Sequence, residues 1–178
     1  MKKLHKLRNQ KGFTIVELLI VIVVIGILAA LVLNAFSGVQ AKARDTKRQT
    51  DIRAISSQLE AWYNGGGNGS YPLNNALTDS YAQTNFPGFD INAFRPPNVA
   101  SNAMTTGTAV TGGTYSGTSI TTWPTGTTPA PTTTTYVYAP FNVAAGAATA
   151  CSSGTCTHFI LSYYNESTST VVVKQSLN

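Results

Sequence analysis

The strongest pattern in the chain is a run of apolar residues close to its N-terminus. Residues 18–33 contain no polar side chain, and the apolar stretch from Phe13 to Leu33 has 21 residues. As an α-helix this stretch is roughly 31 Å long, enough to cross the hydrocarbon core of a bilayer. One acidic residue, Glu17, interrupts its beginning. The pattern therefore predicts a membrane-spanning helix with a charged residue near one end.

A second helical pattern follows directly, in residues 37–64. Its apolar positions recur at the three- and four-residue steps of an amphipathic helix. These positions are Ile52, Ile55, Leu59, Trp62 and Tyr63. Three glycines at 65–67 would end the helix, so the two patterns together predict one helix over residues 14–64. We expect Trp62, Tyr63 and Tyr71 to pack in a core rather than to form a stacking platform for a ligand.

Strand patterns are confined to the second half of the chain. The candidates are Thr135–Ala139, His158–Tyr164 and Thr170–Gln175, and the last two read as a hairpin. An isolated hairpin is marginal, so the strands need the amphipathic helix to pack on. The sequence therefore predicts an α+β fold, in which a small antiparallel sheet packs on the long N-terminal helix.

The segment between the helix and these strands is rich in Thr and Gly at 100–135, and no Lys, Arg, Asp or Glu occurs from Pro96 to Asn165. This composition favours a plain exposed loop, with an O-glycosylated stalk as the alternative. Asn68 and Asn165 also begin minimal N-glycosylation sequons, which are common by chance.

Charge is distributed unevenly along the chain. The formal net charge is +5, yet five of the twelve Lys and Arg residues lie within the first twelve positions. The remainder has seven basic and seven acidic residues, so its formal charge is 7 − 7 = 0. Because only Arg95 and Lys174 are basic after residue 65, no direct nucleic-acid site is expected.

A basic cluster follows the apolar run. It consists of Lys42, Arg44, Lys47 and Arg48. One interpretation is a solvated helix face, relieved by nearby acids. The other is a surface that binds anionic lipid heads or the acids of a neighbouring molecule.

The two cysteines, Cys151 and Cys156, follow a membrane-length segment and lie close together in sequence, which favours a disulfide over a metal site or free thiols. His158 is the only imidazole near them. No catalytic constellation, phosphate-binding loop or metal cluster is recognisable, so we expect no enzymatic activity and no cofactor.

The basic N-terminus before an apolar run could mark an ordinary secretory signal peptide. However, the apolar stretch is too long for that, and no A-x-A site follows at 36–41. Instead a small residue, Gly12, precedes Phe13, and Glu17 follows four residues later. A charge within a span costs up to about 3 kcal/mol at the bilayer centre. Glu17 should therefore either have a partner or lie solvated at interface depth.

The segment KGFTIVELLIVIVVIGILAALVL resembles the class III signal of type IV prepilins and pseudopilins. That pattern has a basic leader, a Gly, a cleavage point, Phe-Thr, a Glu four residues past the Phe, and a long apolar helix. The resemblance implies that a prepilin peptidase removes leader 1–12 by cutting between Gly12 and Phe13, and that it methylates the new amino group of Phe13. It also implies that Glu17 pairs with that amino group on a neighbouring subunit during assembly.

The resemblance further implies the pilin fold, with a transmembrane and assembly helix at 13–36, an amphipathic helix at 37–64 and a β-rich head at 65–178. Gly26 and Asn34 are its expected points of helix flexibility. Pilins commonly carry Pro at the place of Asn34, and this departure weakens the case for unwinding there.

By resemblance, the function is that of a structural subunit of a type IV pilus, serving adhesion, twitching motility or DNA uptake. The implied partners are copies of the chain, the prepilin peptidase, an assembly platform in the membrane and the lipid bilayer. The precursor would lie in the inner membrane with its N-terminus inside, and the assembled filament outside the cell.

Two alternatives remain open. One is a pseudopilin of a type II secretion or competence system. Major secretion pseudopilins typically hold calcium in an acid-bearing C-terminal loop, whereas Glu166 is the only acid here after Asp90. The other is a membrane-anchored binding module that never polymerises, and the combination of Gly12, Phe13 and Glu17 argues against it.

Overall fold

The computed structural model describes residues 12–178, so the predicted leader lies outside it except for its last residue. The chain forms two compact units, one ending at Gln40 and the other comprising Ala41–Asn178. The first helix, α1 (Ile15–Asn64), runs through the boundary between them. Its bounds agree within one residue with the helix predicted over 14–64.

In the first unit, α1 has no other element to pack on. The large apolar side chains that can be assessed here are all exposed, from Val24 at 48% to Phe13 at 89%. By length and composition, α1 is the one helix of the described chain able to cross a membrane. The helix continues through Gly26 and Asn34, and their flexibility stays a prediction.

The second unit adds one short α-helix, one 3₁₀ helix and nine strands among the described residues. The helices are α2 (Asp79–Asn85) and η1 (Ile91–Phe94). The strands are β1 (Met104–Thr106), β2 (Ala109–Thr111), β3 (Thr114–Ser116), β4 (Ser119–Thr122), β5 (Gly126–Thr128), β6 (Tyr136–Ala144), β7 (Ala147–Ala150), β8 (His158–Asn165) and β9 (Thr170–Gln175).

The main sheet has the order β1-β6-β8-β9, and β7 pairs with the far end of β6. The three predicted strands are confirmed as β6, β8 and β9, and the last two form the predicted hairpin. The expectation of a purely antiparallel sheet was wrong in one respect, because β1 pairs with β6 in parallel. The connection between them, residues 107–135, is long enough for the crossover that a parallel pair requires.

The interpretation of residues 100–135 as a plain exposed loop is corrected by the structure. This segment contains β1 to β5, with β2 paired to β5 and β3 paired to β4. Between its exposed threonines stand four apolar side chains that pack against one face of the main sheet. They are Val110, Tyr115, Ile120 and Trp123, and they cover Ala139, Phe141, Val143 and Ile160. The sparse apolar residues fix the segment, and most of its threonines face solvent, although Thr127 is buried and its hydroxyl bonds to that of Ser162.

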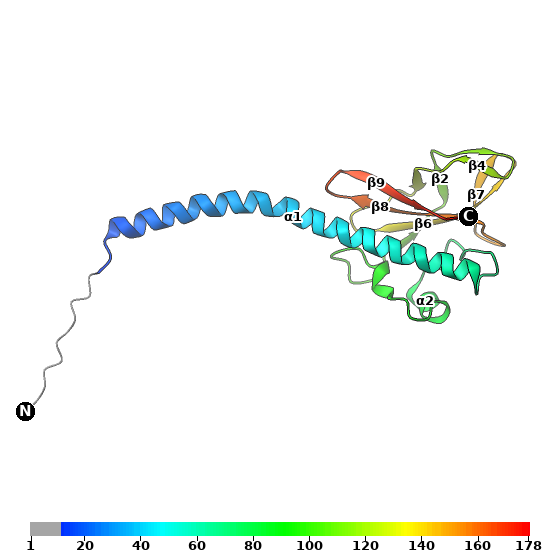
Figure 1. Cartoon of the computed structure of the whole chain (residues 1–178), viewed down its shortest axis with the longest axis horizontal. Helices are drawn as coiled ribbons and strands as arrows, with labels where there is room; N and C mark the ends of the chain where they lie inside the picture. Colours follow the sequence, from blue (N-terminus) through cyan, green and yellow to red (C-terminus); the bar gives the residue numbers. More distant parts are fainter. Residues whose placement is uncertain (1–11) are drawn as a thin grey trace, which may run out of the picture. The chain divides into compact units, whose positions relative to one another are not determined.

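The opposite face of the sheet holds the larger core. Alternate residues of β6 and β8, such as Tyr138 and Phe159, point to this face, where they meet Ile55 and Leu59 of α1. Figure 1 shows the last part of α1 beside these strands, with α2 next to it. Tyr71 is also buried in this core.

The predicted role of the aromatic residues at the end of α1 is confirmed. Trp62 and Tyr63 pack against the core, and Tyr63 stacks on Tyr71 with ring centroids 4.5 Å apart.

A partly buried ion-pair cluster joins α1 to the turn between β8 and β9, and we call it the helix–hairpin cluster. Its members are Arg44, Asp45, Arg48, Glu166 and Ser167. Arg48 is only 1% exposed and bonds to Asp45, Glu166 and the carbonyl of Thr133. Arg44 holds the same Glu166 carboxylate from its Nε and Nη2 atoms.

Asp45 also contributes acceptors to this cluster. Its Oδ1 accepts the backbone N–H of Glu166 and its Oδ2 that of Ser167, both at 2.9 Å. The interpretation of the basic residues at 42–48 as a solvated face was therefore wrong for Arg44 and Arg48. Lys47 also has an internal partner, since its Nζ lies 2.7 Å from Asp51.

The cluster shifts the pKa values of its carboxyl groups. Burial acts to raise the pKa of Asp45, but the hydrogen bonds from Ser167, from two backbone N–H groups and from Arg48 outweigh it and lower the pKa. Hydrogen bonds from Arg44 and then Arg48 lower the pKa of Glu166. Burial raises the pKa of Asp51, despite its bonds to Lys47 and Tyr136.

Replacing Asp45 by Asn should destabilise the second unit by about 3 kcal/mol. The variant removes a counter-ion of buried Arg48, and its side-chain amide nitrogen would face N–H donors where Asp45 offers an acceptor. Thermal unfolding of the full chain in detergent measures the effect. Asp90→Asn, at an exposed carboxylate without an ion pair among residues 12–178, is the matched control and should change stability by less than about 0.5 kcal/mol. Equal effects of the two variants would contradict a structural role for the cluster.

Low pH should weaken the helix–hairpin cluster. A carboxyl group with a lowered pKa stabilises the fold above its unfolded-state value, near 4, and this stabilisation is lost as the pH falls through the folded-state value. Asp45 and Glu166 act in this direction, and Asp51, with its raised pKa, partly offsets them. The unfolding temperature should therefore fall between pH 5 and pH 3. The unfolding temperature of Glu166→Gln should fall less over that interval. An equal fall in the variant and the unaltered chain would contradict a contribution of the Glu166 carboxylate to the pH dependence.

Candidate functional site

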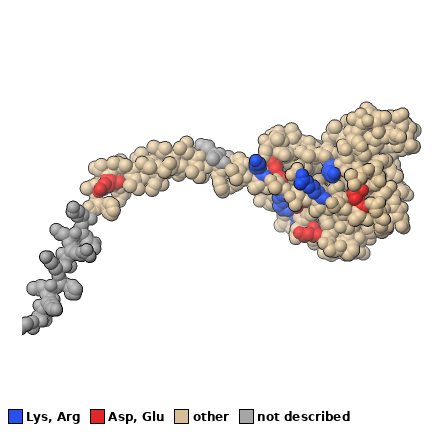
Figure 2. All heavy atoms as spheres, in the orientation of Figure 1, with Lys and Arg blue, Asp and Glu red and all other residues tan. Residues whose placement is uncertain are grey.

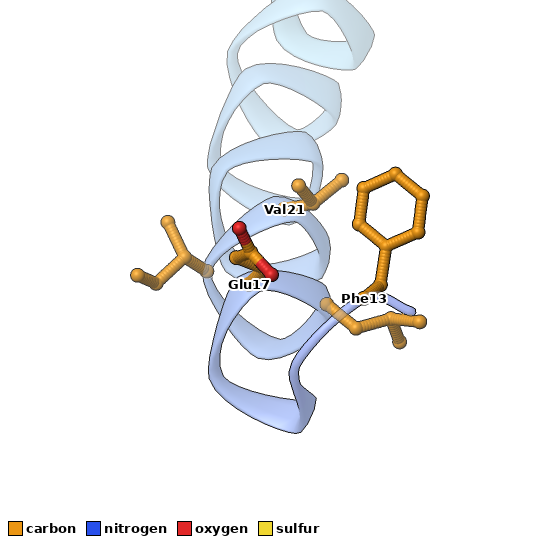
Figure 3. A pocket seen from close by; sticks show the side chains of 5 residues that line it. Phe13, Glu17 and Val21 are labelled. Atoms are coloured by element: carbon orange, nitrogen blue, oxygen red, sulfur yellow. The ribbon is translucent and has the colours of Figure 1, made fainter. Parts of the chain in front are cut away.

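The predicted site residues of the first unit meet at the start of α1. Phe13, Glu17, Leu18, Ile20 and Val21 line a shallow groove on the helix surface. Figure 3 shows the Phe13 ring lying beside the first turns on the side of Val21, with the Glu17 carboxylate at the helix surface. One acid thus stands among apolar side chains that have no cover within their own unit.

Glu17 takes part in a capping box at the N-terminus of α1. Its Oε2 accepts the backbone N–H and the hydroxyl of Thr14, both at 2.8 Å. In return, the Thr14 hydroxyl oxygen accepts the backbone N–H of Glu17 at 3.2 Å. Thr14 is thus the N-cap and Glu17 the third helical residue of the pattern Thr-x-x-Glu, which satisfies two backbone N–H groups that the helix leaves open.

The capping box has two consequences for Glu17. The carboxylate is held near the positive end of the helix dipole, which stabilises a negative charge there. Only Oε2 is used within the part of the chain that the structure describes, so Oε1 is available to a cation from elsewhere. The first-turn arrangement can therefore orient the carboxylate and still offer an acceptor.

Sequence reasoning missed this local role. The signal was present, because a Thr followed three residues later by a Glu, directly before an apolar run, is the sequence signature of a capping box.

The cysteines lie in the second unit, far along the chain from Glu17. Cys151 and Cys156 form a disulfide with their Cα atoms 5.8 Å apart. The backbone carbonyls of the same two residues accept the N–H groups of Asn74 and Tyr71. The disulfide loop therefore holds the segment that follows the glycine turn, and it lies next to the core rather than at a reactive surface. Within residues 12–178, no group of three or more His, Cys, Asp or Glu could hold a metal ion.

Comparison with known proteins identifies the N-terminal motif. The family model of the prokaryotic N-terminal methylation motif matches residues 7–33. The type II secretion system core protein G of Dickeya chrysanthemi is 44% identical over 55 residues, which are 31% of this chain and 36% of that protein. The protein of the same name from Escherichia coli K12 is 36% identical over 75 residues, 42% of this chain and 50% of that protein.

A pilin is also similar. The type IV major pilin protein PilA of Myxococcus xanthus is 33% identical over 55 residues, which are 31% of this chain and 25% of that protein. The chain therefore spans half or less of the length of each of these relatives. No solved structure matches it significantly.

The chain carries a class III signal peptide of the pilin and pseudopilin type. Its α+β architecture, with a long N-terminal helix packed on a small mixed sheet, is consistent with the pilin fold. Proteins of this family are structural subunits rather than enzymes, in agreement with the absence of enzymatic activity expected from the sequence.

Loss of the Thr14 hydroxyl should loosen the first turn of α1 by about 1 kcal/mol, the usual effect of removing an N-cap side chain. Hydrogen exchange of the full chain in micelles, read at the Glu17 amide, measures the effect. Thr14→Val should exchange about fivefold faster than the unaltered chain. Thr14→Ser keeps the hydroxyl and should exchange at the unaltered rate. Equal protection in Thr14→Val and Thr14→Ser would show that the capping box does not stabilise the helix start.

Proposed function

We propose that this chain is the structural subunit of a type IV pilin-like filament, built around the helix at 13–36. One observation carries the proposal: the apolar surface of α1 in the first unit is exposed throughout the residues that can be assessed, with one oriented acid at its head. An apolar surface this large must be covered, first by lipid and then by other copies of the same helix.

Maturation follows from the N-terminal motif. A prepilin peptidase would cut between Gly12 and Phe13 and methylate the amino group of Phe13. Before the cut, the five basic leader residues would hold the N-terminus on the cytoplasmic side of the membrane. After it, that restraint is gone, and an assembly platform could draw the helix out of the bilayer into the filament.

Glu17 is the proposed assembly residue. The amino group of Phe13 stays cationic after methylation, and inside a filament it would be buried away from water. A neighbour's Glu17 offers Oε1 as a counter-ion, and pairing removes the cost of two isolated buried charges. The same pair would fix the axial register of adjacent subunits.

Two kinds of filament share this N-terminus. A type IV pilus, used in adhesion, twitching motility or DNA uptake, is our first candidate. Glu166, the only acid after Asp90, is bound by Arg44 and Arg48, which leaves no free carboxylate there for the calcium expected of secretion pseudopilins. The second candidate is a pseudopilin of a type II secretion system, because six of the similar proteins bear that name.

Substitutions at Glu17 separate its two roles. Glu17→Gln keeps an oxygen that can accept the Thr14 bonds but loses the charge, whereas Glu17→Ala loses both. If Glu17 neutralises the amino group of a neighbour, both variants should yield at least about tenfold fewer sheared filaments, since each leaves a buried cation unpaired. If Glu17 serves only as a cap, Glu17→Gln should assemble normally.

The measurement is the amount of subunit in filaments sheared from cells, together with its N-terminal sequence and intact mass. Subunits that begin at N-methylated Phe13 in the unaltered chain establish cleavage and polymerisation together. A chain recovered only from membranes and still carrying its leader would refute the proposal. Glu17→Asp retains the charge on a shorter side chain and should assemble better than Glu17→Gln.

A further inference from the structure

The second unit carries unlike charges on the two sides of α1. Asp51 and Arg53 lie two residues apart, which places them about 3 Å apart along the helix axis and about 200° apart around it. Each belongs to a different cluster of charged side chains. The two clusters therefore lie on different flanks of the helix and at nearly the same level.

The first cluster, which we call the acidic flank, gathers where α1 meets η1. Its members are Lys47, Asp51, Asp79, Asp90 and Arg95. Lys47 pairs with Asp51, and Arg95 pairs with Asp79 at 3.0 Å. Lys47 and Arg95 line one hollow. Asp90 lies near Arg95, because the Asn92 side chain donates to Asp90 Oδ1 at 2.8 Å and accepts from Arg95 at 2.7 Å.

Asp90 is the carboxylate of the acidic flank that takes part in neither of these two ion pairs. It is exposed and caps η1 by accepting the N–H of Asn92 at 2.9 Å, but it has no ion pair in the described part of the chain. With two cations and three carboxylates, the acidic flank has a formal charge of 2 − 3 = −1.

The second cluster, the basic flank, gathers where α1 meets the end of β9. Arg53, Glu60 and Lys174 line one hollow there, together with Ser57 and Leu177. Arg53 and Lys174 are exposed, and neither has an ion pair among residues 12–178.

Glu60 does little to neutralise this flank. Its two oxygens accept the Tyr71 hydroxyl at 2.8 Å and the Leu177 N–H at 2.9 Å. Counting side chains alone, the formal charge of the basic flank is 2 − 1 = +1. Figure 2 shows the charged side chains gathered along this part of α1 and none around β2, β4 and β7.

Two different complementary surfaces on one molecule favour a head-to-tail contact between copies. A contact that joins unlike surfaces leaves one of each free at the ends, so it propagates into a ring or an open helical filament. We propose that the basic flank of one copy binds the acidic flank of the next, with Asp90 seated between Arg53 and Lys174 of its neighbour. This inference rests on the proposed polymerisation and adds a contact between the second units.

Charge reversal tests the pairing in cells that produce and process the full chain. Asp90→Lys alone, or Arg53→Glu with Lys174→Glu, places like charges at every contact and should lower the yield of sheared filaments about tenfold. All three changes together restore opposite charges and should return the yield to within about twofold of the unaltered chain. Thr118→Lys adds a cation to the uncharged turn between β3 and β4 and should leave the yield unchanged.

A cross-link tests the geometry. Asp90→Cys combined with Lys174→Cys should give disulfide-linked ladders of subunits in filaments, because each copy contributes both flanks. Each single cysteine should give no link. Dimers from Asp90→Cys alone would indicate a contact between like surfaces and overturn the inference.

The outcomes separate this inference from the proposed function. Unaltered yields after charge reversal, or no recovery in the triple variant despite normal cleavage at Phe13, would overturn the flank pairing and leave polymerisation through α1 intact. Failure of the unaltered chain itself to form filaments would refute the proposed function. Binding of a polyanion such as DNA that needs Arg53 and Lys174, with assembly unaffected by their reversal, would also overturn the inference.

Discussion

A helix as long as α1 persists only if its apolar residues are buried, and this chain supplies cover for only one half of it. Most helical stability in proteins comes from packing of an apolar face rather than from helix propensity. In the second unit, Ile55 and Leu59 have that packing, at 1% and 0% exposure. In the first unit, the cover must come from outside the chain. The need for a lipid or protein environment around residues 13–33 is therefore built into the fold.

The second unit is organised to hold its part of α1 firmly. Apolar contacts fix one face of the helix against β6 and β8, and the helix–hairpin cluster fixes its beginning against the turn after β8. Charged groups are costly to bury, so Arg48 is tolerated only because several acceptors surround it. Such a contact specifies one geometry, since any shift of the helix along the sheet would leave charges unpaired.

The sequence predicted the elements whose signals are local. Periodicity located α1, and runs of aromatic and β-branched residues located β6, β8 and β9. The signals of the Thr-rich segment are weak because its strands have three or four residues and only single apolar positions, such as Val110 or Ile120. The parallel pairing of β1 depends on residues some thirty positions apart, which no local pattern specifies.

Charged residues were the least predictable part of the molecule. The nearby acids suggested a solvated face for Arg44 and Arg48, and only the structure shows that both bind Glu166, more than a hundred residues later. Whether a charged side chain is exposed or paired depends on residues far away in the sequence, which a local pattern does not show. The Thr14 and Glu17 pair is the opposite case, because its partners lie three residues apart and a known pattern describes them.

The arrangement at the head of α1 resolves an apparent conflict over Glu17. A carboxylate that used both oxygens to cap its own helix would be unavailable to a neighbour, and one that used both to pair with a neighbour would leave the helix start uncapped. Both bonds from Thr14 end on Oε2, so the two oxygens can serve different partners. The cap also removes the rotational freedom that a flexible glutamate would lose on pairing. A local helix signal can in this way lower the entropic cost of an intermolecular contact.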